Sequence, residues 1–253
     1  MENKIVVFAN QKGGVGKTSL AISLAHWLTL GNIPVLFVDA DLQQSAATLR
    51  QEDAENFSTP EPWKIYPLDI TSKDDVKTML SKLKNLPGTV IIDSPGSLDN
   101  DNVKYIFNAA DVIVIPIEYS RVAIDSTAKF AEVLKKMKDA GFLHGKVYYL
   151  PNKFDERSKK VDRSEIVNRL ENIIGIVGTR VNERAAIKNE LTTFSFPSSV
   201  KGCFKYAFAA LTSEIYGKQN RCFCQSEGWS GEDIPCDFPC SLADSGQHSS
   251  TLC

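Results

Sequence analysis

Residues 10–19 have the sequence Asn-Gln-Lys-Gly-Gly-Val-Gly-Lys-Thr-Ser. An apolar run, 5–9, precedes this stretch, and a helical pattern of Leu and Ala follows it. Gly13, Gly14 and Gly16 allow positive φ angles, which let consecutive backbone N–H groups converge on phosphate oxygens. The N-terminus of the following helix adds its partial positive charge. The stretch therefore predicts a phosphate-binding loop between a strand and a helix.

Two side chains at the end of this stretch have the chemistry that a nucleoside triphosphate requires. The ammonium group of Lys17 can reach the β- and γ-phosphates, and the Thr18 hydroxyl can ligate Mg²⁺. A glycine-rich loop alone is weak evidence, but Lys-Thr in a strand–turn–helix context is a strong signal. The residues predicted to bind the nucleotide here are Gly13, Gly14, Val15, Gly16, Lys17, Thr18 and Ser19.

Short apolar runs alternate with helical patterns up to about residue 218. This alternation is typical of βαβ units, so we expect an α/β fold with a mostly parallel, doubly wound sheet and flanking helices. Leu20, Leu24 and Leu28 form one helical stripe, and polar Ser23 and His26 face away from it. Later helices are expected to end at Gly141 and Gly217. The further predicted strands are Val35–Val38, Val90–Ile92, Val112–Ile117 and Val147–Leu150.

Three carboxylates follow predicted strands. Asp39 and Asp41 come after 35–38, and Asp93 comes after 90–92. Open α/β folds bind ligands at the carboxyl ends of their strands, where a carboxylate can hold an Mg²⁺-bound water. Ordinary structural interpretations remain open: Asp93 also suits a turn before Pro-Gly, and a helix cap suits Asp41 but does not explain Asp39.

The loop and carboxylates together resemble those of the ParA/MinD ATPases, whose "deviant" Walker A motif begins with a second lysine, here Lys12. The resemblance implies a P-loop NTPase of the SIMIBI type. It also implies that Lys12 reaches the partner's phosphates in a nucleotide-sandwich dimer, that Asp41 positions or activates the attacking water, and that Asp39 lies in the outer shell of Mg²⁺. The implied catalytic residues are Lys12, Lys17 and Asp41, and the implied metal residues are Thr18, Asp39 and Asp93.

The base pocket is expected after the strand at 147–150, where Asn152-Lys153-Phe154-Asp155 follows Pro151. This matches the Asn-Lys-x-Asp pattern with which many GTPases bind guanine. Asn at this position also contacts adenine in ParA/MinD relatives. We therefore expect ATP as the nucleotide, with Asn152 as the base contact and Asp155 as a turn residue.

The resemblance further implies a slow, Mg²⁺-dependent, partner-stimulated ATP hydrolase that drives plasmid or chromosome partition. Such proteins form ATP-dependent homodimers, bind DNA nonspecifically and respond to a ParB-like centromere-binding protein. Basic side chains placed for phosphates rather than bases would form the DNA surface, although a solvated helix face explains them nearly as well. The predicted DNA-binding residues are Arg180, Arg184, Lys188, Lys201 and Lys205.

Composition limits the other functional classes. The 253 residues contain 29 Lys and Arg against 31 Asp and Glu, which excludes a histone-like basic protein. No apolar run approaches the roughly 20 residues that cross a bilayer, so we expect a cytoplasmic protein with no membrane contact. The resemblance to ParA-type ATPases further implies association with the nucleoid. A MinD-like membrane ATPase would need a terminal amphipathic helix. A ParA homologue in polar positioning or cellulose synthesis would differ only in its partner.

The segment 219–253 differs from the rest, so the expected domains are an ATPase domain at 1–218 and a Cys- and Ser-rich acidic tail at 219–253. All the cysteines except Cys203 lie in this tail. A disordered appendage is expected, because the segment has no sustained helical or strand period. The alternatives are an iron–sulfur carrier and a metal site, whose candidate ligands are Cys222, Cys224, Cys236 and Cys240.

Overall fold

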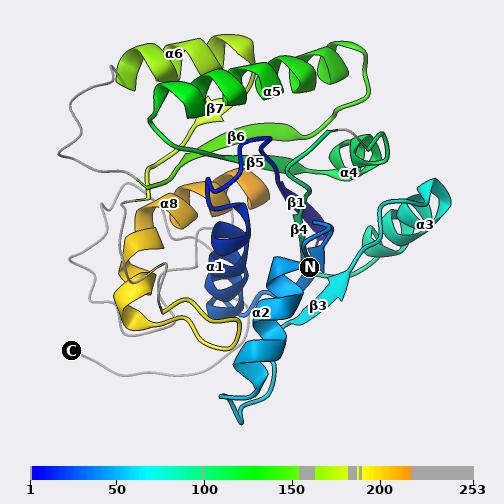
Figure 1. The fold of residues 1–253 in the computed structure, drawn as a ribbon, viewed down its shortest axis with the longest axis vertical. Coiled ribbons are helices and arrows are strands. Elements are labelled where there is room, and N and C mark those ends of the chain that lie inside the picture. The colour runs from blue at the N-terminus through cyan, green and yellow to red at the C-terminus, as the bar shows by residue number, and fades with distance from the viewer. Residues whose placement is uncertain (1, 99, 154–162, 182–186, 188–189, 218–253) are drawn as a thin grey trace, which may run out of the picture.

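The computed structural model describes residues 2–98, 100–153, 163–181, 187 and 190–217, which form one sheet covered by helices (Figure 1). The seven strands are all parallel, in the order β3-β2-β4-β1-β5-β6-β7. The predicted α/β class is therefore confirmed. The strands are β1 (Lys4–Phe8), β2 (Val35–Asp39), β3 (Lys64–Pro67), β4 (Thr89–Asp93), β5 (Val112–Ile117), β6 (Lys146–Pro151) and β7 (Ile176–Val177).

The sheet has an apolar layer on each face. On one face α3, α4, α5 and α6 pack over the alternate side chains of the central strands, such as Ile5 and Val7. On the other face α1, α2 and α8 cover Val6 and Phe8. The helices are α1 (Lys17–Leu30), α2 (Ser45–Ala54), α3 (Lys73–Leu83), α4 (Val103–Ala109), α5 (Arg121–Asp139), α6 (Arg163–Ile173) and α8 (Ser198–Tyr216).

The five apolar runs predicted to be strands all lie in the sheet, as β1, β2, β4, β5 and β6. Strands covered on both faces are apolar nearly throughout, which is why these could be found from the sequence. The two edge strands were not predicted. β3 is mostly exposed, and β7 has only two residues, so neither carries an apolar run.

The helix ends follow the predicted glycines. Gly141 has φ +69° directly after the last turn of α5, and Gly217 has φ +77° after α8. Only a residue without Cβ adopts this left-handed conformation freely, so both helices stop there.

Ser23 and His26, the polar side chains predicted to face away from the Leu stripe of α1, are both buried. Ser23 is fully buried and His26 is 4% exposed. The His26 Nε2 atom lies 2.8 Å from the carbonyl oxygen of Thr192, and its ring stacks on Phe196. The chain leading into α8 therefore covers the side of α1 that faces away from the sheet, and α1 is packed from both sides.

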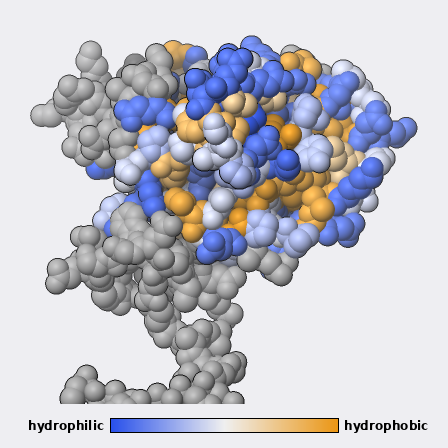
Figure 2. All heavy atoms as spheres, turned by 90° about the horizontal axis from the view of Figure 1, so that it is seen from below, coloured by the Kyte–Doolittle hydropathy of each residue, from blue (hydrophilic) through white to orange (hydrophobic). Residues whose placement is uncertain are grey.

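Within the described ranges, no helix is both long and apolar enough to cross a bilayer. Figure 2 shows the face seen from below in Figure 1, where hydrophobic residues come to the surface among hydrophilic ones. The predicted tail at 219–253, with its candidate metal ligands, lies outside the described residues, so the division into 1–218 and 219–253 stays a prediction.

Candidate functional site

The glycine-rich loop joins β1 to α1. Gly14 has φ +74° and Gly16 has φ +92°, as their sequence positions predicted, whereas Gly13 does not take a positive φ. Asn10 anchors the start of the loop: its side chain donates to the carbonyl oxygen of Pro116 at 2.8 Å and accepts from the Lys12 N–H at 3.0 Å. Asn10 was missed by sequence reasoning, although a polar residue that ends an apolar strand was an available signal.

A cavity of about 1170 Å³ opens beside this loop. The loop, residues 41–43, the start of α2, residues 95–97 and residues 152–153 contribute to its walls. Most of the predicted nucleotide and catalytic residues therefore meet at one place, although Lys12 and Val15 are not among the lining residues. Those that line the cavity are Gly13, Gly14, Gly16, Lys17, Thr18, Ser19, Asp41 and Asn152.

Asp93 lies at the end of β4, fully buried behind the cavity wall. The Thr18 hydroxyl donates to its Oδ2 atom at 2.5 Å, and its Oδ1 atom has no hydrogen-bond partner among the described residues. Burial raises the pKa of Asp93 to about 7, against the lowering effects of the Thr18 hydrogen bond and the Lys17 charge. An unpaired buried carboxylate oxygen beside a hydroxyl is a donor set that suits Mg²⁺.

Asp39, at the end of β2, accepts hydrogen bonds from backbone N–H groups. Its Oδ2 accepts from the N–H groups of Ala46 and Ala47, at 3.0 and 3.1 Å, in the first turn of α2. The helix-cap interpretation that the sequence left open for Asp41 therefore belongs to Asp39 instead. Burial raises the pKa of Asp39, and these backbone hydrogen bonds act in the opposite direction. The outer-shell metal role of Asp39 stays a prediction.

Asp41 lies at the cavity, in the turn that links β2 to α2. It is half-buried, and its Oδ1 accepts from the Gln43 N–H at 3.0 Å. The next side chain, Leu42, is 76% exposed. Gly96, three residues after Asp93, also lines the cavity. A Cβ on Gly96 would lie 3.6 Å from the Nζ atom of Lys17. Asp41 and Gly96 thus approach the loop from two different strand ends.

Asn152 and Lys153, at the end of β6, contact the backbone of the loop and also line the cavity. The Asn152 side chain is buried, and its Nδ2 donates to the carbonyl oxygen of Val15 at 2.8 Å. The exposed Lys153 donates from Nζ to the carbonyl oxygen of Gly14 at 2.6 Å. Asn152 is therefore beside the loop as well as at the cavity, while Asp155 lies outside the described residues.

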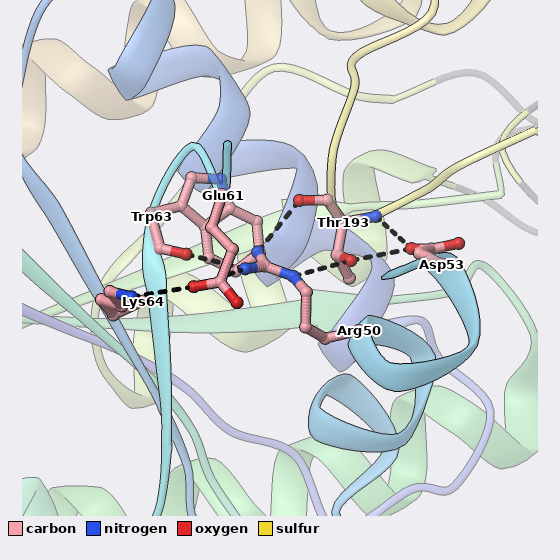
Figure 3. A network of polar contacts seen from close by, with 6 residues as sticks. All are labelled: Arg50, Asp53, Glu61, Trp63, Lys64 and Thr193. Atoms are coloured by element: carbon pink, nitrogen blue, oxygen red, sulfur yellow. Dashed lines mark hydrogen bonds and ion pairs between the residues drawn. The ribbon is translucent and has the colours of Figure 1, made fainter. Parts of the chain in front are cut away.

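A buried polar network joins α2 to the chain before α8 (Figure 3). The Arg50 guanidinium donates to the Oγ1 and carbonyl oxygens of Thr193, at 2.9 and 3.0 Å, and to the carbonyl of Trp63. Asp53 Oδ2 accepts from the N–H and the hydroxyl of the same Thr193. Sequence reasoning missed this network, because Thr193 lies 143 and 140 residues from Arg50 and Asp53 along the chain.

The structure describes only some of the predicted DNA-binding residues. Arg180 is exposed just after β7, and Lys201 and Lys205 are half-buried, one turn apart on α8. Lys205 Nζ lies 5.6 Å from the centroid of the Tyr206 ring. Arg184 and Lys188 lie outside the described residues.

The geometry defines a class of protein. The sheet is parallel, and a glycine-rich loop follows β1. A lysine and a threonine begin α1, and carboxylates lie at neighbouring strand ends. This is the architecture of a P-loop nucleotide-binding protein. Within the described residues, no group of three His, Cys, Asp or Glu side chains could hold a metal ion by itself.

Comparison with known proteins identifies the family. Residues 6–195 match the CobQ/CobB/MinD/ParA nucleotide binding domain, and the chain belongs to this family. It is 31% identical over 115 residues to the maintenance of carboxysome distribution protein A of Gloeobacter kilaueensis (45% of this chain). It is also 26% identical over 165 residues to the chromosome-partitioning ATPase Soj of Treponema pallidum (53% of this chain). The chain spans only 48% and 65% of these two relatives.

Solved structures share the fold at low sequence identity. A McdA variant of Cyanothece in complex with ATP superposes with a TM-score of 0.65 at 19% identity, covering 85% of this chain and 96% of that chain.

Proposed function

We propose that this chain is a Mg²⁺-dependent ATPase that dimerises on ATP and acts as a nucleotide-timed switch. The observation that carries the proposal is the convergence of Lys17, Thr18 and Asp41 on one cavity beside a loop with two left-handed glycines, with the buried Asp93 bonded to Thr18. The structurally similar McdA variant of Cyanothece is a complex with ATP, which supports ATP as the nucleotide.

Each predicted residue has a defined task in this proposal. The loop N–H groups and Lys17 bind the β- and γ-phosphates, and Asn152 contacts the base. Thr18 and Asp93 hold Mg²⁺, with Asp39 behind them. Bound there, the ion would neutralise phosphate charge during transfer.

Asp41 orients the attacking water, because it is the half-buried carboxylate at the cavity that has one oxygen beyond its backbone contact. Lys12 is half-buried and does not line the cavity of its own chain. We assign it to the phosphates of a partner protomer across a sandwich dimer. Leu42, exposed beside Asp41, would be covered when two protomers close.

We further propose that the ATP-bound dimer binds DNA nonspecifically through a basic surface that includes Arg180, Lys201 and Lys205. A ParB-like protein would then stimulate hydrolysis, so that the protein cycles on and off the nucleoid during plasmid or chromosome partition. The similarity to the partitioning ATPase Soj supports this role. The tail at 219–253 is proposed to be a separate appendage.

A second function is supported by one comparison. The chain is also similar to a maintenance of carboxysome distribution protein, so its cargo can be a protein body instead of DNA carrying a centromere. Both functions share the nucleotide switch and differ in the partner that stimulates hydrolysis.

Retention of nonspecific DNA with ATP, ADP, GTP or no nucleotide, at two salt concentrations, tests the proposal. We expect retention only with ATP and a steep loss as salt rises, because counterion release dominates such binding. Lys201→Glu with Lys205→Glu should weaken retention and leave ATP turnover near the wild-type rate. Lys135→Glu, on the exposed side of α5, is the matched control. Retention that ignores the nucleotide would overturn the switch, and retention unchanged by the double substitution would overturn the basic surface.

A further inference from the structure

Two neighbouring residues at another strand end, Asn152 and Lys153, hydrogen-bond to the backbone of the phosphate-binding loop. Asn152 donates to the carbonyl of Val15, and Lys153 donates to the carbonyl of Gly14. These two carbonyls belong to consecutive peptide groups, and both donors come from the two residues that follow β6. The contacts span 137 and 139 residues of sequence, so they join the first strand region to a strand end beyond the midpoint of the chain.

The peptide group is planar and trans, so its C=O and its N–H point in opposite directions. The carbonyl of Gly14 shares a peptide group with the N–H of Val15, and the carbonyl of Val15 shares one with the N–H of Gly16. A donor that holds a carbonyl on one side of the loop therefore turns the paired N–H toward the other side. Two such donors fix the directions of two consecutive N–H groups.

The Asn152 donor is itself fixed. The Asn152 N–H donates to the carbonyl of Ile117 at the end of β5, and the carbonyl of Pro151 accepts from the N–H of Val181. The Asn152 side chain is 7% exposed and lies so close to the loop that a Cβ on Gly16 would be 2.5 Å from its Nδ2. A rigid donor can impose a conformation on a glycine-rich loop that has many alternatives by itself.

We propose that Asn152 and Lys153 are positioning residues, which preorganise the Val15 and Gly16 N–H groups for phosphate binding by holding the Gly14 and Val15 carbonyls. This inference rests on the proposed nucleotide function and adds to the base contact assigned to Asn152. The Asn152 amide has two N–H donors and one acceptor. Its bond to Val15 uses one donor, which leaves the other donor and Oδ1 for a base.

A ligand with phosphates and no base separates the two roles. Binding of magnesium tripolyphosphate and of magnesium ATP to the full chain would be measured by calorimetry for the wild type, Asn152→Ala and Lys153→Met. We expect each substitution to weaken tripolyphosphate binding about tenfold, the effect of one well-placed hydrogen bond. Lys153→Arg, which keeps a donor and the charge, should restore most of the affinity.

Two matched controls make the same chemical change elsewhere. Asn108→Ala removes an amide that donates to the carbonyl of Phe142, and Lys146→Met removes an ammonium that donates to the carbonyl of Glu214. Both should bind tripolyphosphate like the wild type. Asn152 is uncharged, so a loss in Asn152→Ala cannot come from weaker charge attraction. Amide proton shifts of Val15 and Gly16 on adding tripolyphosphate should be smaller in both site variants.

Each outcome decides the proposal. A wild-type chain that binds neither tripolyphosphate nor ATP would refute the proposed function itself. If the wild type binds both, and Asn152→Ala loses only ATP affinity while Lys153→Met equals its control, the two residues do not position the loop. Should Asn152→Ala fail to fold, Lys153→Met decides alone, because the Lys153 side chain is exposed and its loss leaves the core intact.

Discussion

The Thr18 hydroxyl donates to Oδ2 of Asp93 at 2.5 Å, and this bond ties the start of α1 to the end of β4. The other oxygen of Asp93, Oδ1, is buried with no partner among the described residues. A carboxylate in that state destabilises the free protein, because its charge is removed from water. Sites of this kind lower the stability of the free protein in return for ligand binding, and the free energy of unfolding measures the difference.

Asp93→Asn should stabilise the protein and abolish Mg²⁺-dependent hydrolysis. The amide has nearly the same shape and no charge to desolvate, so we expect a higher urea midpoint at pH 7.5 without ligand, by an amount equivalent to about 1 kcal/mol or more. ATP turnover should fall to background. A variant that is less stable than the wild type, or that hydrolyses ATP normally, would contradict the assignment of Asp93.

Substitutions of Lys17 and Asp41 should separate binding from hydrolysis. Lys17→Ala removes the ammonium group from the phosphate site, so nucleotide binding should be lost. Asp41→Ala should keep ATP binding and lower hydrolysis by at least about a hundredfold, the scale of a positioned general base, so that an ATP-bound dimer accumulates. Light scattering with ATP and magnesium measures the dimer. Normal turnover by Asp41→Ala would remove this residue from the mechanism.

Gly16 and Gly88 both have positive φ, but alanine should lower nucleotide affinity at Gly16 and stability at Gly88. Gly16→Ala strains the loop by about 2 kcal/mol, or roughly 30-fold in nucleotide affinity, with little change in the sheet. A Cβ on Gly88 would lie 2.3 Å from the carbonyl oxygen of Pro34, which also accepts the Thr89 N–H at the start of β4. Gly88→Ala should therefore lower the free energy of unfolding, while the folded fraction binds ATP normally. Calorimetry and urea unfolding on both variants distinguish the two effects.

His26 should make stability depend on pH. Burial lowers the pKa of His26 from 6.5 to about 4, and the nearby Arg50 charge acts in the same direction. Above pH 6.5 the imidazole is neutral in both states and contributes no pH dependence. Below pH 6.5 the unfolded chain takes up a proton that the folded chain excludes, so stability falls, by about 3 kcal/mol in total near pH 4. Urea unfolding between pH 4.5 and 7.5 should show this slope, and His26→Gln should flatten it; equal slopes would be evidence against a buried neutral imidazole.

The Arg50 network should stabilise the attachment of α2 to the chain before α8. Thr193→Val keeps the shape and removes a hydroxyl that bonds both Arg50 and Asp53, so we expect a loss of about 2 kcal/mol. Arg50→Met should cost about 3 kcal/mol, since it leaves Asp53 buried without the attraction of the Arg50 charge. The double variant should lose less than the sum, because the two residues share one bond. Lys135→Met, in the exposed pair with Asp139, is a control expected to change little. Additive losses would mean that Arg50 and Thr193 are not coupled.

The sequence alone determined the central strands and the loop, because their signals are local. A strand buried on both faces must be apolar along its whole length, and a loop that binds phosphate needs glycines, Lys17 and Thr18 close together. For the same reason the sequence alone predicts that Asp41 and Asp93 lie at one edge of the sheet. The glycines after α5 and α8 are likewise local requirements of backbone conformation.

Only the tertiary structure decided which polar residues are buried and what they bond. The sequence predicted only that His26 faces away from the Leu stripe of α1, and the structure shows that Thr192 and Phe196, 166 and 170 residues away in sequence, contact it. Asp39 turned out to be the carboxylate that caps α2, and Asn152 bonds to a loop 137 residues distant. Local sequence patterns predict only those properties that depend on neighbouring residues in the chain. Partners brought together by folding leave no such pattern, because any donor at the right place in space serves equally well.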